Sequence, residues 1–516
     1  MKAKLLRFVH LALAIFVASA SAYPATAPAG DGLRISGVVI NAVSGDPVSG
    51  AEVAIGFSQK QDVVASVSTA SDGSFEFRGL QAGKYWLVAQ GKSFSRQGYQ
   101  QHDSYFTGVA VGKGLESTDL AFRVTPDASI GGTISDDAND PVADARVLLF
   151  HTGVDEGKRS TTLRGQTTTD DDGKYRFSHL EPGTYLIAVS GRPWYAQYVN
   201  LAPAKGENRD QRSPLDVAFP VTYFSGTTDG DQASPIQVRG GEKATADLQL
   251  TPVPGVHVIV NGADDSKSGI SISMVQQIMG TSVPPVGSQV TALPNGQYEV
   301  AGIAPGQYTA VVQTYGKGQA NHQRQIDLAQ DAEINTEDIS AGAQISGTVT
   351  LDGAPAATGG VVRLMNHDSG DTLQAVIDSK GHFTVNEEMI AAGHYDVAIF
   401  NVPDTAVKGM LATGARITGL SVEVARGATV QLSLALIRGL GQVDGVVMRQ
   451  GKPVAGAMVV LVPQDMDNNI GLLRRDQSDS DGTFTLRNVV PGEYNVLALE
   501  SGWDMEWRSP GVLSPF

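Results

Sequence analysis

The chain has 516 residues, including 59 glycines and 24 prolines, and a formal net charge of −16. Apolar residues make up 41% of it, which is too many for a disordered chain. The acidity argues against nucleic acid as a partner, because such binding depends on Lys and Arg neutralising phosphates. Without cysteine, neither disulfides nor a lipid-modified cysteine anchor are expected.

The first 22 residues have the pattern of a signal peptide. Lys2, Lys4 and Arg7 precede an apolar run over residues 8–17, and Ala20-Ser21-Ala22 fits the rule of small residues before a cleavage site. We therefore expect cleavage after Ala22 and a secreted, periplasmic or cell-surface protein; the alternative is a retained N-terminal anchor. Residues 23–32 are an Ala/Pro-rich linker, and no later segment is apolar enough to span a membrane.

One phrase then occurs five times, beginning at Asp72, Asp172, Asn295, Lys380 and Asp481. It consists of a turn with glycine, an alternating apolar strand, a second turn with glycine, and a tyrosine that begins the next strand. We expect these positions to be structural, with the tyrosines in the core or at a corner of the fold. They are Gly73, Gly83 and Tyr85; Gly173, Gly183 and Tyr185; Gly296, Gly306 and Tyr308; Gly381, Gly393 and Tyr395; and Gly482, Gly492 and Tyr494.

Upstream of four copies lies a strand that contains a glycine, beginning at Ile35, Ile130, Ile345 and Val443. In three copies a turn and a second strand of the form P-V-x-G-A-x-V or P-V-x-D-A-x-V follow, from Pro47, Pro141 and Pro453. Short strands at regular spacing with turn signals between them predict all-β sandwiches.

A period of about 90 to 120 residues indicates about five domains of one kind. The boundaries predicted from the alternating strands that close each unit are 33–125, 126–252 with a long insert, 253–341, 342–438 and 439–516. The third unit diverges most. The fifth ends 22 residues after Tyr494, so we expect it to lack its closing strand and to leave a sheet edge open or completed by another segment.

The order of G-x-V, P-V-x-G-A-x-V, D-G-x-F-x-F and P-G-x-Y resembles the carboxypeptidase regulatory-like domain. That family is a small prealbumin-like sandwich, similar in shape to collagen-adhesin B-type repeats and starch-binding-like modules. The resemblance is strongest in units one, two and five. It implies an accessory module without peptidase activity, in a secreted or envelope protein of bacteria.

Carbohydrate binding is the functional hypothesis with candidate residues, because sugar rings stack on exposed aromatic faces. The candidates are Trp194, Tyr195 and Tyr198 in the insert, and Trp503 with Trp507 near the end. The alternative is that these aromatics close a sandwich end or pack between domains.

Motifs for catalysis and for metal binding are absent from the sequence. The nine histidines do not form a His-x-x-Glu zinc signature, and neither a Gly-x-Ser-x-Gly nor a phosphate-loop motif occurs. Asp170-Asp171-Asp172-Gly173 and Asp479-Ser480-Asp481-Gly482 resemble part of a calcium loop but lack its end carboxylates, which favours β-turns with exposed acids. We expect neither catalytic residues, nor a metal, nor a cofactor.

The sequence thus predicts a non-catalytic rod of tandem sandwiches that binds or spaces at the cell envelope. Its expected partner is a polysaccharide or an envelope protein. The alternative function is a structural or protein-interaction scaffold with no glycan ligand.

Overall fold

The computed structural model describes residues 32–513, except 61, 116, 156, 199–212, 262–268, 294–295, 316–319, 336–339, 342, 357, 367–371, 386–389, 465, 467–468 and 510. The fold is all-β, as the alternating patterns predicted, and the helices among these residues are short 3₁₀ helices between strands. The strands form successive pairs of sheets, which we number sandwiches 1 to 5 in chain order. Within the described residues, no helix has the length and apolar character needed to cross a membrane.

Sandwich 1 shows the common plan. Its opening strand β1 (Leu33–Asn41) pairs antiparallel with β4 (Ser74–Leu80) and parallel with the closing strand β8 (Leu120–Val124). The second sheet runs β3 (Ala65–Ser68), β2 (Glu52–Phe57) and β5 (Gly83–Gly91), with β6 (Phe94–Gly98) and β7 (Val109–Val111) both on β5. Alternate residues face inward, so the core lies between the sheets.

Sandwiches 2 and 3 repeat this plan with longer hairpins. In sandwich 2, β9 (Ala128–Asp136) lies between β12 (Lys174–Leu180) and the parallel strands β17 (Lys243–Thr245) and β18 (Leu248–Leu250). The facing sheet contains β11 (Lys158–Thr168), β10 (Arg146–Asp155), β13 (Gly183–Ser190), β15 (Thr222–Tyr223) and β16 (Ile236–Val238). Its insert carries the 3₁₀ helices η1 (Trp194–Tyr198) and η2 (Gly230–Gln232), and β14 (Val217–Ala218), which pairs with β19 (Val253–Pro254).

In sandwich 3, the first sheet runs β23 (Gln289–Ala292), β24 (Tyr298–Ile303), β20 (Val256–Asn261) and β27 (Ala332–Asn335). The second runs β22 (Thr281–Val283), β21 (Gly269–Ile278), β25 (Gly306–Tyr315), β26 (Ala320–Leu328) and β28 (Ser340–Ala341). The closing strand β27 is again parallel to the opening strand β20.

In sandwich 4, β29 (Gln344–Leu351) pairs with β30 (Ala354–Pro355), β33 (His382–Thr384) and the parallel β38 (Thr429–Arg438), which pairs with β35 (Thr405–Thr413). The other sheet is β32 (Thr372–Val376), β31 (Val361–Asn366), β34 (Gly393–Phe400), β37 (Ser421–Val424) and β36 (Arg416–Thr418).

Sandwich 5 is smaller. Its opening strand β39 (Gly441–Val446) pairs with β44 (Thr483–Val489), and β42 (Met458–Pro463) lies between β43 (Arg474–Gln477) and β45 (Tyr494–Leu499). The short strands β40 (Met448–Arg449) and β41 (Lys452–Pro453) form a hairpin, and η5 (Ile470–Leu472) and η6 (Gly502–Asp504) complete the unit.

The recurring turn needs glycine for two reasons. Gly73 has φ +75, and a Cβ at this position would lie 2.7 Å from the carbonyl oxygen of Val39 on the opening strand. Gly173 repeats both features, with φ +70 and an approach of 2.4 Å to the carbonyl of Ile134. A larger residue would therefore strain the turn and push it off the opening strand.

The recurring tyrosines make one and the same corner. The hydroxyl of each donates a hydrogen bond to a backbone carbonyl four residues earlier, at 2.7 to 3.0 Å. Four are 3% exposed or less, and Tyr494 of sandwich 5 is half-buried. The pairs are Tyr85 with Gln81, Tyr185 with Glu181, Tyr308 with Ala304, Tyr395 with Ala391 and Tyr494 with Val490.

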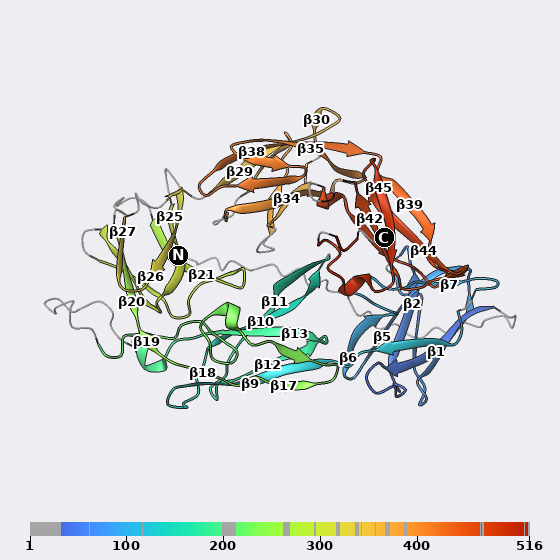
Figure 1. Cartoon of the computed structure of the whole chain (residues 1–516), viewed down its shortest axis with the longest axis horizontal. Helices are drawn as coiled ribbons and strands as arrows, with labels where there is room; N and C mark the ends of the chain where they lie inside the picture. The colour runs from blue at the N-terminus through green and yellow to red at the C-terminus, as the bar shows by residue number, and fades with distance from the viewer. Residues whose placement is uncertain are drawn as a thin grey trace.

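The predicted rod is wrong, because the five sandwiches are arranged in a ring (Figure 1). The chain passes from sandwich 1 through 2, 3 and 4, and sandwich 5 returns to contact sandwiches 1 and 2. The contacts that close the ring join residues up to 399 positions apart in the sequence. A periodic pattern reports contacts within each unit and carries no information about such distant ones.

Candidate functional site: the interior of the ring

The ring is closed by a turn of sandwich 5 that fits against sandwich 1. The Lys84 ammonium contacts Asp479 Oδ2 at 2.5 Å, and Asp479 Oδ1 accepts a hydrogen bond from the Gly108 amide at 2.9 Å. Burial raises the pKa of Asp479, and the ion pair with Lys84 opposes that rise. The acids of this turn were expected to be exposed; Asp479 instead fastens two sandwiches together.

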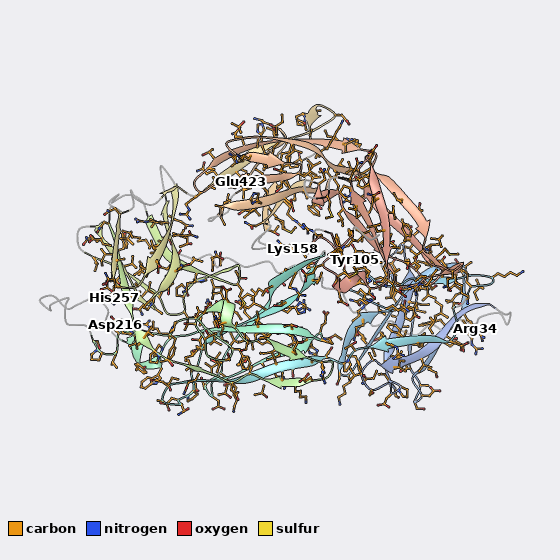
Figure 2. The ribbon with its side chains drawn as sticks, in the orientation of Figure 1. Arg34, Tyr105, Lys158, Asp216, His257 and Glu423 are labelled. Atoms are coloured by element: carbon orange, nitrogen blue, oxygen red, sulfur yellow. The ribbon has the colours of Figure 1, made fainter. Side chains whose placement is uncertain are left out.

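Buried polar groups extend this contact. Gln477 is 2% exposed, and its amide donates to Gln100 O at 2.7 Å and to Thr107 Oγ1 at 2.8 Å. His102 stacks on Trp503 with 5.1 Å between ring centroids and an interplanar angle of 3°. Figure 2 shows Tyr105 in the same contact, between sandwiches 1 and 5.

Trp507 closes the ring onto sandwich 2. Trp507 is 1% exposed, and its indole lies over Gly157 at the tip of the hairpin β10–β11, where a Cβ would come within 2.3 Å of the indole. The Arg508 amide donates to Gly157 O at 3.0 Å, and Arg159 pairs with Glu506 at 2.8 Å. Trp503 is likewise buried, at 8% exposure, so neither tryptophan offers the open stacking face predicted for carbohydrate. Both follow the alternative of packing between domains.

The insert aromatics are placed differently. Trp194 is 63% exposed and meets the half-buried Tyr195 edge-on, with 5.7 Å between centroids. Both lie on η1, and neither lines the central cavity described below. Tyr198 ends η1, and its side chain lies outside the described residues. Trp194 and Tyr195 therefore remain candidates for a surface contact.

A cavity of about 900 Å³ opens inside the ring between sandwiches 2, 3, 4 and 5, and we call it the central cavity. Its size is within the range of about 300–1,000 Å³ typical of ligand pockets. Sandwich 2 contributes most of the wall through the long hairpin β10–β11, and Figure 2 shows Lys158 of this hairpin near the middle of the ring. The lining comprises Asp155, Lys158, Arg159, Ser160, Thr161, Thr162, Leu186, Tyr223, Asp229, Gly230, Asp231, Gln277, Met279, Gly280, Gln307, Met365, Asn366, Asp396 and Arg508.

The chemistry of this lining is mixed. Four aspartates and three cations leave an excess of one negative charge, and the lining also includes hydroxyls and carboxamides. Burial, with the nearby charges of Asp229 and Asp231, raises the pKa of Tyr223, so its phenol stays protonated and able to donate. Met279, Met365 and Leu186 supply apolar surface. Such a wall suits a neutral or weakly charged ligand with many hydroxyl groups.

A second cavity, of about 560 Å³, adjoins the first between sandwiches 4 and 5. Met365, Asp396 and Arg508 line both. The half-exposed Phe400 lies in this second cavity with the guanidinium of Arg363 4.7 Å from its ring centroid. The two cavities thus form a continuous interior surface that meets at Arg508.

Sequence reasoning did not find these residues. They come from four sandwiches, and none is a repeat position. The signal that could have indicated them is the long polar run of residues 158–168, which form one strand of the hairpin that projects into the ring.

A buried polar cluster fixes sandwich 2 to sandwich 3. The imidazole of His257 contacts Glu299 Oε1 at 2.9 Å through Nδ1 and Asp216 Oδ2 at 2.8 Å through Nε2, and all three side chains are less than 10% exposed. Figure 2 shows Asp216 and His257 at this joint. An apolar cluster that includes Leu148 and Phe150 of sandwich 2 and Ile278 and Val283 of sandwich 3 forms a further contact between these two sandwiches. In the part of the chain that the structure describes, His, Asp and Glu side chains do not gather in threes suited to a metal ion.

Comparisons with known proteins agree with this fold. The carboxypeptidase regulatory-like domain family matches residues 34–125 and 129–215, and the second β-sandwich domain of NOMO1-like subunits of the BOS complex matches residues 440–512. The protein is therefore a tandem array of β-sandwiches. More particularly, residues 34–125 and 129–215 match the carboxypeptidase regulatory-like domain twice in tandem, as the repeat motifs predicted.

Similar curated proteins are bacterial. Bone sialoprotein-binding protein of Staphylococcus aureus is 28% identical over 179 residues, which are 31% of this chain and 15% of that protein. Serine-aspartate repeat-containing protein F of Staphylococcus epidermidis is 26% identical over 137 residues, 24% of this chain and 8% of that one. The chain thus spans only a small part of the length of these relatives.

The chain also matches solved structures at low identity and low TM-score. The minor pilin of Streptococcus agalactiae is 13% identical with a TM-score of 0.21, over 43% of this chain and 96% of the pilin. The Bacillus anthracis TIE protein is 11% identical with a TM-score of 0.18, over 78% of this chain and 73% of that one.

Proposed function

We propose that the protein is a non-catalytic binding protein of the bacterial cell surface that holds a polysaccharide segment in the central cavity. It is exported through residues 1–22, with cleavage after Ala22. The observation that carries the proposal is the cavity wall, in which hydroxyl, carboxamide and charged groups of both signs from four sandwiches converge on one space. The small net charge of the lining disfavours a strongly ionic ligand, and the interleaved apolar groups suit the C–H faces of sugars.

The test measures binding of the full chain to a glycan array and to insoluble polysaccharides. Asp231→Ala and Arg508→Ala remove polar groups that sandwiches 2 and 5 contribute to the cavity lining, and both should weaken glycan binding by about tenfold or more. Trp194→Ala is the matched control, because its side chain is exposed and lies outside the cavity lining.

Loss in the two cavity variants alone supports the proposal. Loss in Trp194→Ala alone would move the glycan site to η1 and overturn the cavity assignment. No binding across a broad panel would overturn glycan recognition itself.

The second candidate is an interaction scaffold without a glycan ligand. One relative is named for its binding to bone sialoprotein, which supports a protein partner for this chain too. A feature of sandwich 5 favours the same class of partner.

A further inference from the structure

Sandwich 5 lacks, among the residues that the structure describes, the strand that completes the matching sheet elsewhere. In sandwiches 1 to 4 the opening strand has a parallel neighbour, β8, β17 with β18, β27 and β38 respectively. The opening strand β39 of sandwich 5 pairs with β44, and its other edge has no strand beside it in the described residues. Four copies of one fold therefore show what normally covers this edge.

The missing strand leaves the core of sandwich 5 uncovered. The inward residues of the opening strand are fully buried in sandwich 1, where Ile35 and Val39 are 0% exposed. The equivalent Val443 and Val447 are only half-buried. In sandwich 4 the closing strand supplies the cover through apolar residues at alternate positions, including Leu432 and Leu434, both 1% exposed.

The backbone of β39 is also available. The Val447 amide donates a hydrogen bond to Gly482 O at 2.7 Å, so the backbone groups of the odd-numbered residues of this strand face β44. The backbone amide and carbonyl groups of Asp444 and Val446 therefore face the open side. Ser36, which is the equivalent of Asp444 in sandwich 1, donates its amide to Ser117 O on the closing segment at 3.1 Å. Val446 is 52% exposed and Met448 54%, so this end of β39 is open to solvent on the outer face of the sheet.

We propose that the open edge of β39 binds an extended segment of a partner polypeptide, added parallel to β39 with apolar side chains at every second position. The register of sandwich 4 defines the segment. Leu432 lies opposite Gly347 and Leu434 opposite Val349, so the partner must place apolar residues opposite Gly445 and Val447. Backbone groups supply the pairing, and the half-buried core of sandwich 5 selects the side chains. This site is separate from the central cavity.

The probe is a synthetic peptide of residues 429–438, the closing strand of sandwich 4, added to the full chain. Amide hydrogen exchange at residues 443–447 should slow by about tenfold or more at saturation. A control peptide with serine in place of Val430, Leu432 and Leu434 keeps the backbone but removes the apolar pattern, and should give no protection.

The protein variant Val446→Pro removes an amide on the open side, which an edge strand tolerates, and it should abolish peptide binding. Unchanged fluorescence of the buried Trp503 and Trp507 would show that sandwich 5 remains folded in this variant.

Three results would overturn the proposal: no protection at residues 443–447, equal binding by Val446→Pro, or protection confined to residues 345–349 through exchange with the strand of sandwich 4. Dimerisation of the chain through β39 without peptide would also overturn it, since the occupant would then be a second copy.

Discussion

Closure of the ring depends on the contact between Trp507 of sandwich 5 and Gly157 of sandwich 2, and a larger side chain at residue 157 should break it. Gly157→Leu places a side chain where the Trp507 ring now lies, because even a Cβ there would be 2.3 Å from the indole. Expelling a buried tryptophan re-exposes about 150–250 Å² of surface, which at about 25 cal/mol/Å² costs about 4–6 kcal/mol. Contact between sandwiches 2 and 5 should therefore weaken by about 10³- to 10⁴-fold.

The variant also carries a backbone cost, since Gly157 has φ +76, and this cost needs its own control. Gly353 has φ +81 in the turn between β29 and β30, and nothing lies within 4 Å of its Cβ position. Gly353→Leu therefore shares the strain of about 1–2 kcal/mol without the collision.

Small-angle scattering and tryptophan fluorescence are the assays. With a radius of gyration of about 13 Å for each sandwich, five sandwiches in a ring give roughly 30 Å for the whole chain and five in a line roughly 50 Å. We expect Gly157→Leu, combined with Asp479→Ala at the contact with sandwich 1, to move toward the larger value with red-shifted emission. Identical scattering and emission for Gly157→Leu and Gly353→Leu would refute the role given to Trp507.

Three further predictions concern buried polar groups. Lys84→Met leaves the Asp479 carboxylate without its cation and should destabilise the ring by up to about 3 kcal/mol at neutral pH. Burial already raises the pKa of Asp479, so this carboxylate becomes neutral as the pH falls and the loss of stability should shrink. A loss of stability in urea unfolding that does not depend on pH would contradict this. Tyr185→Phe should cost about 0.5–1.5 kcal/mol of folding stability through its lost hydrogen bond. Burial raises the pKa of Tyr185 to about 12, so the stability that depends on its neutral phenol is complete below the usual pKa of 10.0 and is lost as the pH rises through 12. Unfolding followed by circular dichroism over this pH range should therefore show a smaller alkaline loss of stability in the variant. His257→Ala leaves the carboxylates of Asp216 and Glu299 facing each other in a buried space and should cost about 3–5 kcal/mol at the joint of sandwiches 2 and 3, seen by calorimetry; an unchanged transition would show that the cluster does not hold this joint.

The sequence predicted well whatever is local and repeated. The glycine of the recurring turn and the tyrosine two residues after the second glycine implied a turn and a corner, and the structure contains five corner hydrogen bonds of one pattern.

The contacts between units were beyond such reasoning. Gly157 is indistinguishable in the sequence from any other turn glycine, and only the distant Trp507 explains its second role. The central cavity could not be predicted for the same reason, because its lining residues come from four sandwiches and the sequence of one sandwich does not indicate which others lie next to it.

Ring closure is a competition between intramolecular and intermolecular pairing. Sandwiches 1 and 5 of one chain meet at an effective concentration set by the three sandwiches that connect them, typically in the millimolar range for linked modules. Their surfaces are different from each other, so the same contact made between neighbouring chains is head-to-tail and need not close on itself. Chains crowded on a surface beyond that local concentration would therefore exchange partners and join into linear assemblies, whereas dilute chains stay as single rings.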